Sequence, residues 1–215
     1  MAEDDTKKEF GTLDNSVLIY TEVTPERASN ILNGNYEPTQ TILDRPKRWY
    51  AETVLEFFQP EALKKQGITR NQPLFTTPIP FQGGNPIESK VLVEMNADAT
   101  TMYVAEATHI SEIITPQFSP SNVLKVNRIS KALEQSKERV SREHFNEMFN
   151  MLPASERLEL VKMYEEQAKK YWESVIPFTE YIKRGLAFVE PEILMKVDTK
   201  IFSSRLSNVP KPNVY

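Results

Sequence analysis

The sequence predicts a single α+β domain with a small mixed or split β-sheet, flanking helices and a helical insertion. Short apolar runs rich in β-favouring residues occur early, in the middle and late in the chain, whereas helical spacing of apolar residues dominates the insertion at about 121–176. Proline (15) outnumbers glycine (6) and marks the borders of most candidate elements. We expect this domain to span residues 13–208, between a flexible charged N-terminus (1–12) and a surface tail (209–215).

The composition excludes several classes of protein. A hydrophobic content of 40% with 11 Phe, 8 Tyr and 2 Trp can fill one core, which excludes wholesale disorder. The formal net charge of −4 argues against a large basic surface for duplex nucleic acid. The absence of cysteine excludes disulfides, Cys-ligated zinc and a thiol nucleophile. No apolar run approaches the roughly 18 residues of a membrane span, so we expect no membrane partner and a cytoplasmic location, in the host cytoplasm or a virion if the source is viral.

The first elements are a strand followed by two helices. The apolar run at 17–20 favours a strand. Thr24, followed by a proline, is typical of a helix N-cap, and Gly34 can end that helix in the left-handed conformation, so we expect a helix over 24–33. A second helix is expected over 44–58, where Pro60 stops it.

Four further strands are expected. Residues 73–77, 90–95 and 101–105 have short β-favouring runs, and a turn is expected at 96–100 between the last two. The segment 186–197 alternates in side-chain character and is the expected last strand.

The insertion is expected to be helical. Apolar residues recur at helical spacing over 121–150, and Pro153 interrupts the pattern. Ser155 is expected to cap a second long helix that reaches about Val175, and Gly185 is expected to end the short segment that follows.

Motifs for familiar chemistries are missing. The chain has two histidines, His109 in an expected loop and His144 in an expected charged helix, and neither has a partner at metal-ligand spacing, so no metal is expected. The sequence contains no phosphate-binding glycine loop, dinucleotide fingerprint or nucleophile elbow. Kinase, P-loop, Rossmann and zinc-hydrolase activities are therefore excluded.

The pair Glu190 and Glu192 is the strongest candidate for chemistry. On a strand, their side chains would share one face about 6.6 Å apart. Two adjacent carboxylates suit reactions at the anomeric carbon of a sugar, where one stabilises positive charge and the other orients an acceptor. The alternative is an exposed strand face that happens to carry two glutamates. The opposite face is apolar and expected in the core: Ala187, Val189, Pro191, Ile193, Met195 and Val197.

The segment Phe188–Lys196 resembles the Glu-x-Glu strand of the ADP-ribosyltransferase superfamily. Other segments resemble the family in the same order along the chain. The strand and helix of 17–34 resemble its first strand and helix, 74–78 resembles its Ser-Thr-Ser strand, and 90–105 resembles its following core strands. The pair Tyr171-Trp172, with a charged segment after it, resembles the DarT-type branch of the superfamily.

The resemblance implies an NAD-dependent transferase that modifies a macromolecular acceptor, protein or nucleic acid. Glu192 would be the main catalytic residue, and Glu190 would serve transfer to the acceptor. NAD would be bound as a substrate, by residues on the first strands: Tyr20, Thr76, Thr77 and Tyr103. The family carries an arginine or histidine at the end of its first strand, where this chain has Tyr20-Thr21-Glu22. A cation could instead come from Arg45, Arg48 or Arg70.

Two other classes of function compete with the transferase. The chain could be a non-enzymatic structural or interaction protein, for example a virion or assembly component, on an inactive fold of the same kind. In that case the amphipathic helices of 121–175 are the candidate surface for an assembly partner. A glycosidase that cleaves nucleotides or sugars could also use the same two glutamates.

Overall fold

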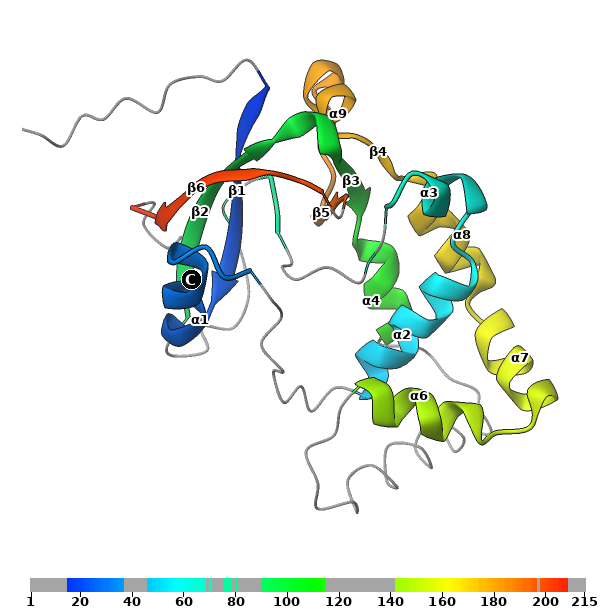
Figure 1. The fold of residues 1–215 in the computed structure, drawn as a ribbon. Helices are drawn as coiled ribbons and strands as arrows, with labels where there is room; N and C mark the ends of the chain where they lie inside the picture. Colours follow the sequence, from blue (N-terminus) through cyan, green and yellow to red (C-terminus); the bar gives the residue numbers. More distant parts are fainter. Residues whose placement is uncertain are drawn as a thin grey trace, which may run out of the picture.

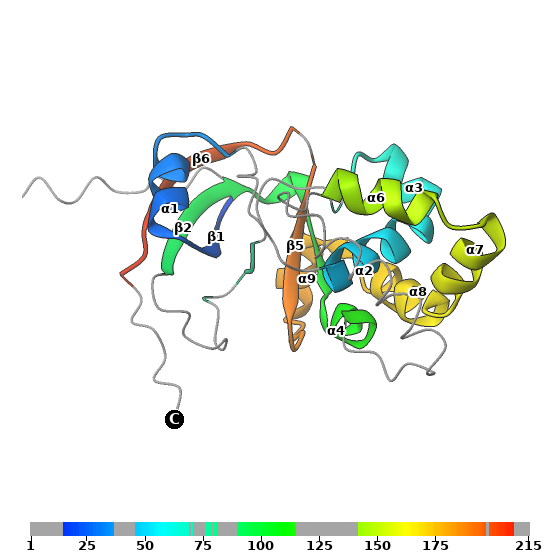
Figure 2. The same ribbon diagram turned by 90° about the horizontal axis from the view of Figure 1, so that it is seen from below.

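The computed structural model describes residues 15–36, 46–68, 70, 76–78, 80, 90–114, 142–196 and 198–208. Within these ranges the chain forms eight helices and two small three-stranded antiparallel sheets, so the predicted α+β class is confirmed. The strands occupy one half of the structure and most of the helices the other (Figures 1 and 2). No helix in the described ranges is both long and apolar enough to cross a membrane.

The first sheet has the order β1-β2-β6. Strand β1 (Ser16–Val23) pairs along its whole length with β2 (Val91–Asp98). Strand β6 (Ile201–Leu206), which was not predicted, pairs with the other edge of β2. Helix α1 (Pro25–Leu32) packs against this sheet (Figure 1) and buries two apolar side chains between them, Ala28 and Ile31.

The second sheet has the order β4-β3-β5. Its central strand β3 (Met102–Glu106) pairs with the two-residue strand β4 (Ile176–Pro177) and with β5 (Pro191–Met195). A single 3₁₀ turn, η1 (Ala99–Thr101), separates β2 from β3, so one bent ribbon runs from the first sheet into the second (Figure 1).

A short segment, Thr76 and Thr77, joins the two sheets a second time. The backbone of Thr77 exchanges two hydrogen bonds of 2.9 Å with Tyr20 in β1. On its other side, the backbone nitrogen of Ile193 in β5 donates to the carbonyl of Thr76 at 2.8 Å. These bridges place the predicted threonine strand between β1 and β5. The rest of that predicted strand, residues 73–75, lies outside the described ranges.

Most of the helices form the other half of the structure. Helix α9 (Phe178–Arg184) is an exception, because it lies beside the second sheet and contacts β3. The remaining helices are α2 (Pro46–Phe57), α3 (Glu61–Lys65), α4 (Thr108–Ile114), α6 (Arg142–Asn150), α7 (Ala154–Lys162) and α8 (Glu165–Glu173).

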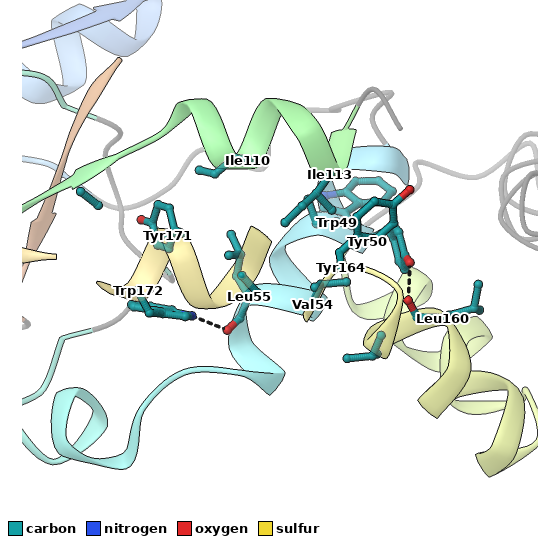
Figure 3. Close-up of a cluster of buried hydrophobic side chains, with 14 of the residues drawn as sticks. Trp49, Tyr50, Val54, Leu55, Ile110, Ile113, Leu160, Tyr164, Tyr171 and Trp172 are labelled. Carbon is teal, nitrogen blue, oxygen red and sulfur yellow. Dashed lines mark hydrogen bonds between the residues drawn. The ribbon is translucent and has the colours of Figure 1, made fainter. Parts of the chain in front are cut away.

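Side chains of β3 and β5 alternate between the two faces of the second sheet and so contribute to two hydrophobic cores. Val104 and Ile193 face the first sheet and join a core that also includes α1 and α9. Ala105 and Leu194 point the other way, into a core built by the helices (Figure 3). The residues on the helical side of β5 are therefore covered by α-helices and not by solvent.

Two buried hydrogen bonds link the helices of the helical core (Figure 3). The indole nitrogen of Trp172 donates to the carbonyl of Leu55 at 2.8 Å, which links α8 to α2. The hydroxyl of Tyr50 donates to the carbonyl of Leu160 at 2.6 Å, which links α2 to α7. Each bond satisfies a polar atom that would otherwise be buried without a partner.

The predicted helix ends are largely confirmed. The Thr24 side chain accepts from the backbone nitrogen of Arg27 at 3.3 Å, as an N-cap does. Gly34 follows α1 with φ +79°, and Gly185 ends α9 with φ +60°. Both angles lie in the left-handed region that glycine adopts without a Cβ clash.

Three predicted borders are wrong. Strand β2 continues through the expected turn as far as Asp98, whose side chain then accepts from the Thr100 nitrogen at 2.9 Å and starts the 3₁₀ turn. The long helix predicted after Pro153 is two helices, and Pro153, not Ser155, occupies the N-cap position. The chain breaks at Tyr164, whose ring packs edge-on against Tyr50. Residues 121–141 of the predicted insertion lie outside the described ranges.

The predicted strand over 186–197 is shorter than expected. Residues 186–190 precede the strand, and the carboxylate of Glu106 accepts from the backbone nitrogens of Val189 (2.7 Å) and Glu190 (2.9 Å). Pro191 then begins β5. Val189, expected in the core, is 80% exposed, whereas Pro191, Ile193 and Met195 are buried as predicted.

The buried tyrosines predict a loss of stability at alkaline pH. Burial, and the neighbouring Tyr164, raise the pKa of Tyr50 well above its ordinary value, and burial raises the pKa of Tyr164 to about 12. The folded state therefore holds these protons more tightly, so this stabilisation is present below the ordinary tyrosine pKa of about 10 and is lost as pH rises beyond it. Urea unfolding should show a falling free energy between about pH 9 and pH 11, with a shallower decline in Tyr50→Phe. Equal slopes would contradict this assignment.

Candidate functional site at the junction of the two sheets

A buried arginine connects the helices to the second sheet. The Arg70 side chain is only 1% exposed. Its Nε donates to Oε2 of Glu52 at 2.7 Å and its Nη2 donates to Oε1 at 2.8 Å, which makes a bidentate pair. Its Nη1 donates to Oε2 of Glu192 and to the hydroxyl of Tyr171. We call these four residues the Arg70 cluster.

Each member of the Arg70 cluster comes from a different part of the fold. Glu52 lies in α2, Tyr171 in α8 and Glu192 in β5. Arg70 is brought alongside by Ile68, which forms a β-bridge with Lys196 just beyond β5. Glu192 and the core residue Leu194 are two residues apart in β5, so their side chains lie on the same face of the sheet. The Glu192 side chain therefore points to the helical side, where the other three members of the Arg70 cluster lie.

The protonation states in the Arg70 cluster follow from burial and from the neighbouring charges. Burial alone lowers the pKa of Arg70, but the carboxylates of Glu192 and Glu52 outweigh this effect and hold its pKa well above the usual value. Burial raises the pKa of Tyr171 well above its usual value, although Arg70 acts in the opposite direction. At neutral pH the guanidinium is therefore charged and the phenol is neutral.

Glu192 is a second carboxylate beside a guanidinium that Glu52 already neutralises. Within the described ranges, the contacts of the Glu192 carboxylate all fall on Oε2, which meets Arg70 and the Tyr171 hydroxyl (3.1 Å). No hydrogen bond or ion pair among the described residues involves Oε1. A buried carboxylate in excess of its counter-charge is costly, and such arrangements concentrate at functional sites.

Strand register places further polar residues on the same face as Glu192. Thr77 pairs with Tyr20, and the bridge between Thr76 and Ile193 sets Thr77 opposite Glu192. Residues paired across neighbouring strands point to the same face of the sheet. The register then continues through β2 and β6, so that one row crosses both sheets: Glu192, Thr77, Tyr20, Glu94 and Arg205.

The far end of this polar row is also built around a carboxylate. Glu94 is 5% exposed, and its Oε2 accepts from Nε of Arg205 at 2.7 Å while its Oε1 accepts from Oγ of Ser207 at 2.7 Å. Burial and the charge of Glu94 raise the pKa of Tyr20, although Arg205 opposes them. Tyr20 is therefore a neutral phenol at physiological pH, able to offer both a ring face and a hydroxyl.

The structure brings together four of the six predicted site residues. Glu192, Thr77 and Tyr20 share one face, and Thr76 supports them through its backbone, while its buried side-chain oxygen has no hydrogen-bond partner in the described part of the chain. Tyr103 is not in this row, because it pairs with Leu194 and not with Glu192; its hydroxyl donates to Gln66 (3.1 Å), and the Lys196 ammonium lies 5.8 Å from its ring centre.

Glu190 is not placed as predicted. It precedes β5 and is exposed, whereas Glu192 is 7% exposed and inside the fold. The expected pair of carboxylates in one environment is therefore wrong, because Glu190 lies in the bend before β5, where its backbone nitrogen donates to Glu106 and its carbonyl accepts from the nitrogen of Ala107. No cluster of metal-ligating side chains occurs among the described residues.

Sequence reasoning missed Glu52 as a site residue and named Tyr171 only within a family motif. Arg70 was one of three possible cations; of the other two, Arg45 lies outside the described ranges and the side chain of Arg48 is not described. A weak signal for Glu52 was present, since Trp49 and Leu55, three residues to either side of it on the same helix face, are large apolar residues. His109, expected in a loop, lies in α4.

Comparisons with protein-family models, curated proteins and solved structures give no match to this chain. The resemblance to ADP-ribosyltransferases therefore stays a prediction, and the function has to be argued from the site.

Removing the guanidinium should destabilise the protein strongly. Arg70→Met leaves Glu52 and Glu192 buried without a counter-charge, so the free energy of unfolding should fall by about 3–5 kcal/mol. Urea unfolding measures this loss. Lys64→Met is the control, because it breaks an exposed ion pair with Glu61 (41% and 73% exposed) and should leave stability nearly unchanged. Equal effects of the two substitutions would contradict a structural role for the Arg70 cluster.

Proposed function

We propose that the protein is an NAD-dependent ADP-ribosyltransferase that modifies a macromolecular acceptor, with Glu192 as the catalytic carboxylate. The observation that carries the proposal is the state of Glu192. It is a buried carboxylate in excess of its counter-charge, with one oxygen held by Arg70 and Tyr171 and the other without a partner in the described part of the chain. It also lies in register with Thr77 and Tyr20, two of the four residues that the family resemblance assigns to NAD.

The geometry suits cleavage of a glycosidic bond. When the bond between nicotinamide and ribose breaks, the bonding electron pair leaves with nicotinamide and positive charge develops on the ribose. A carboxylate already fixed by Arg70 and Tyr171 stabilises that charge without reorganising, which is usually the largest catalytic contribution. Oε1 of Glu192 is the atom assigned to a ribose hydroxyl, and Tyr20 offers its ring to nicotinamide.

Glu190 is assigned to the acceptor. Its exposed position just before β5 lets a macromolecule approach it, and its backbone is held by Glu106. The acceptor's nucleophilic atom forms the new bond to the ribose carbon and loses its proton, for which a nearby carboxylate is a suitable base.

A second function is favoured by one observation, the burial of Glu192. A charged cluster only a few per cent exposed that joins α2, α8 and β5 is also what a purely structural network looks like. In that case the chain would be an interaction or assembly protein. Of the candidate helical surface, Phe145 and Phe149 are buried in the core, whereas Met151 (79% exposed) and Leu158 (42%) remain for a partner.

Glu192→Gln separates the two functions. For an enzyme, transfer of radioactive label from NAD into total protein and nucleic acid should fall by at least about 100-fold, with NAD affinity little changed. Thermal stability should be unchanged or higher, because Arg70 keeps its bidentate pair with Glu52. Glu173→Gln, an exposed glutamate of α8, is the control. Equal labelling by Glu192→Gln and wild type would refute the catalytic assignment, and no labelling together with lower stability would favour the structural function.

Glu190→Gln should have a different signature. If Glu190 serves the acceptor, this substitution should slow transfer to the acceptor more than hydrolysis of NAD, because hydrolysis needs no macromolecular nucleophile. Measuring released nicotinamide and labelled acceptor in the same reaction gives both rates. An equal loss of both rates would remove Glu190 from its assigned role.

A further inference from the structure

We infer that Glu52 is a positioning residue that acts on Glu192 through Arg70, although the two carboxylates share no contact in the described structure. This inference rests on the proposed function of Glu192 and extends the site from β5 into helix α2. Three features support it: the geometry of the guanidinium, the anchoring of α2 and the division of one positive charge between two carboxylates.

The guanidinium geometry makes Glu52 the group that sets the direction of Arg70. A bidentate contact fixes both the plane of a guanidinium and its rotation within that plane. With Nε and Nη2 engaged by Glu52 at 2.7 and 2.8 Å, the remaining nitrogen, Nη1, points at Glu192 and Tyr171. A single hydrogen bond donated by Arg70 to Glu192 could not impose this orientation alone.

Glu52 is itself held by the helical core. Its neighbours Ala51 and Leu55 are fully buried. The bond from Trp172 to the Leu55 carbonyl ties α2 to α8, the helix that carries Tyr171 (Figure 3). The same pair of helices thus places Glu52 on one side of Arg70 and Tyr171 on another, and β5 brings Glu192 to the position that is left.

Glu52 also has an electrostatic effect on Glu192, because the two carboxylates share the positive charge of Arg70. Arg70 carries one positive charge and meets two carboxylates, and Glu52 takes two of its four hydrogen bonds. The positive charge of Arg70 therefore offsets the Glu192 carboxylate less than it would in a one-to-one pair. Neutralising Glu52 would leave Arg70 to Glu192 alone, which both loosens the guanidinium and weakens the carboxylate as a stabiliser of positive charge.

The first test compares Glu52→Gln with Glu56→Gln, which changes a glutamate of the same helix outside the Arg70 cluster. Steady-state kinetics with NAD should show kcat lower by about 10-fold or more in Glu52→Gln and KM within about twofold of wild type, because orientation at the reacting centre is lost and NAD binding is not. Glu56→Gln should leave both constants unchanged. In a Glu192→Gln background, the further effect of Glu52→Gln on kcat should shrink to under about twofold.

The second test does not need activity. Each single substitution leaves Arg70 one carboxylate, but the double substitution Glu52→Gln with Glu192→Gln leaves it none. The loss in thermal midpoint for the double variant should therefore exceed the sum of the single losses by at least about 6 °C. Additive losses would overturn the inference, as would a Glu52→Gln variant that is less stable but has wild-type kcat. If the wild type shows no transferase activity, the proposed function fails. The comparison of thermal midpoints among the wild type, the two single variants and the double variant then decides alone whether Glu52 acts on Glu192.

Discussion

The ion cluster around Arg70 is the interaction on which the rest of the structure depends. A buried guanidinium needs a counter-charge, and two carboxylates from α2 and β5 supply it. Because these partners are far apart in sequence, satisfying one side chain forces the helical half and the second sheet into contact. The neutral hydroxyl of Tyr171 adds α8 to the same junction.

The bent ribbon of β2 and β3 explains why a polar face reaches this junction. The bend lets one side of both sheets enclose the first hydrophobic core, with Met95 and Val104 on that side. The opposite side changes character along its length: it is polar at Tyr20 and Glu94 in the first sheet and apolar under the helices at Leu194. The Arg70 cluster lies where these two environments meet.

The Arg70 cluster also carries a cost in stability. Glu52 alone would neutralise the charge of Arg70, so burying the second negative charge, on Glu192, costs free energy even though its contacts join β5 to the Arg70 cluster. Costs of this kind are expected at sites selected for activity and not for stability.

Local chemistry determined what the sequence could show by itself: the strand at β1, the cap at Thr24 and the glycine ends at Gly34 and Gly185 depend on neighbours a few residues away. It also indicated Glu192, because alternation on a strand is a local rule. Only the tertiary structure selected Arg70 and Glu52 and separated Glu190 from Glu192. It also supplied the unpredicted strands β4 and β6. All of these features depend on strand pairing and burial between segments far apart in the sequence. The residues near a buried charge along the chain do not indicate which distant side chain will neutralise it.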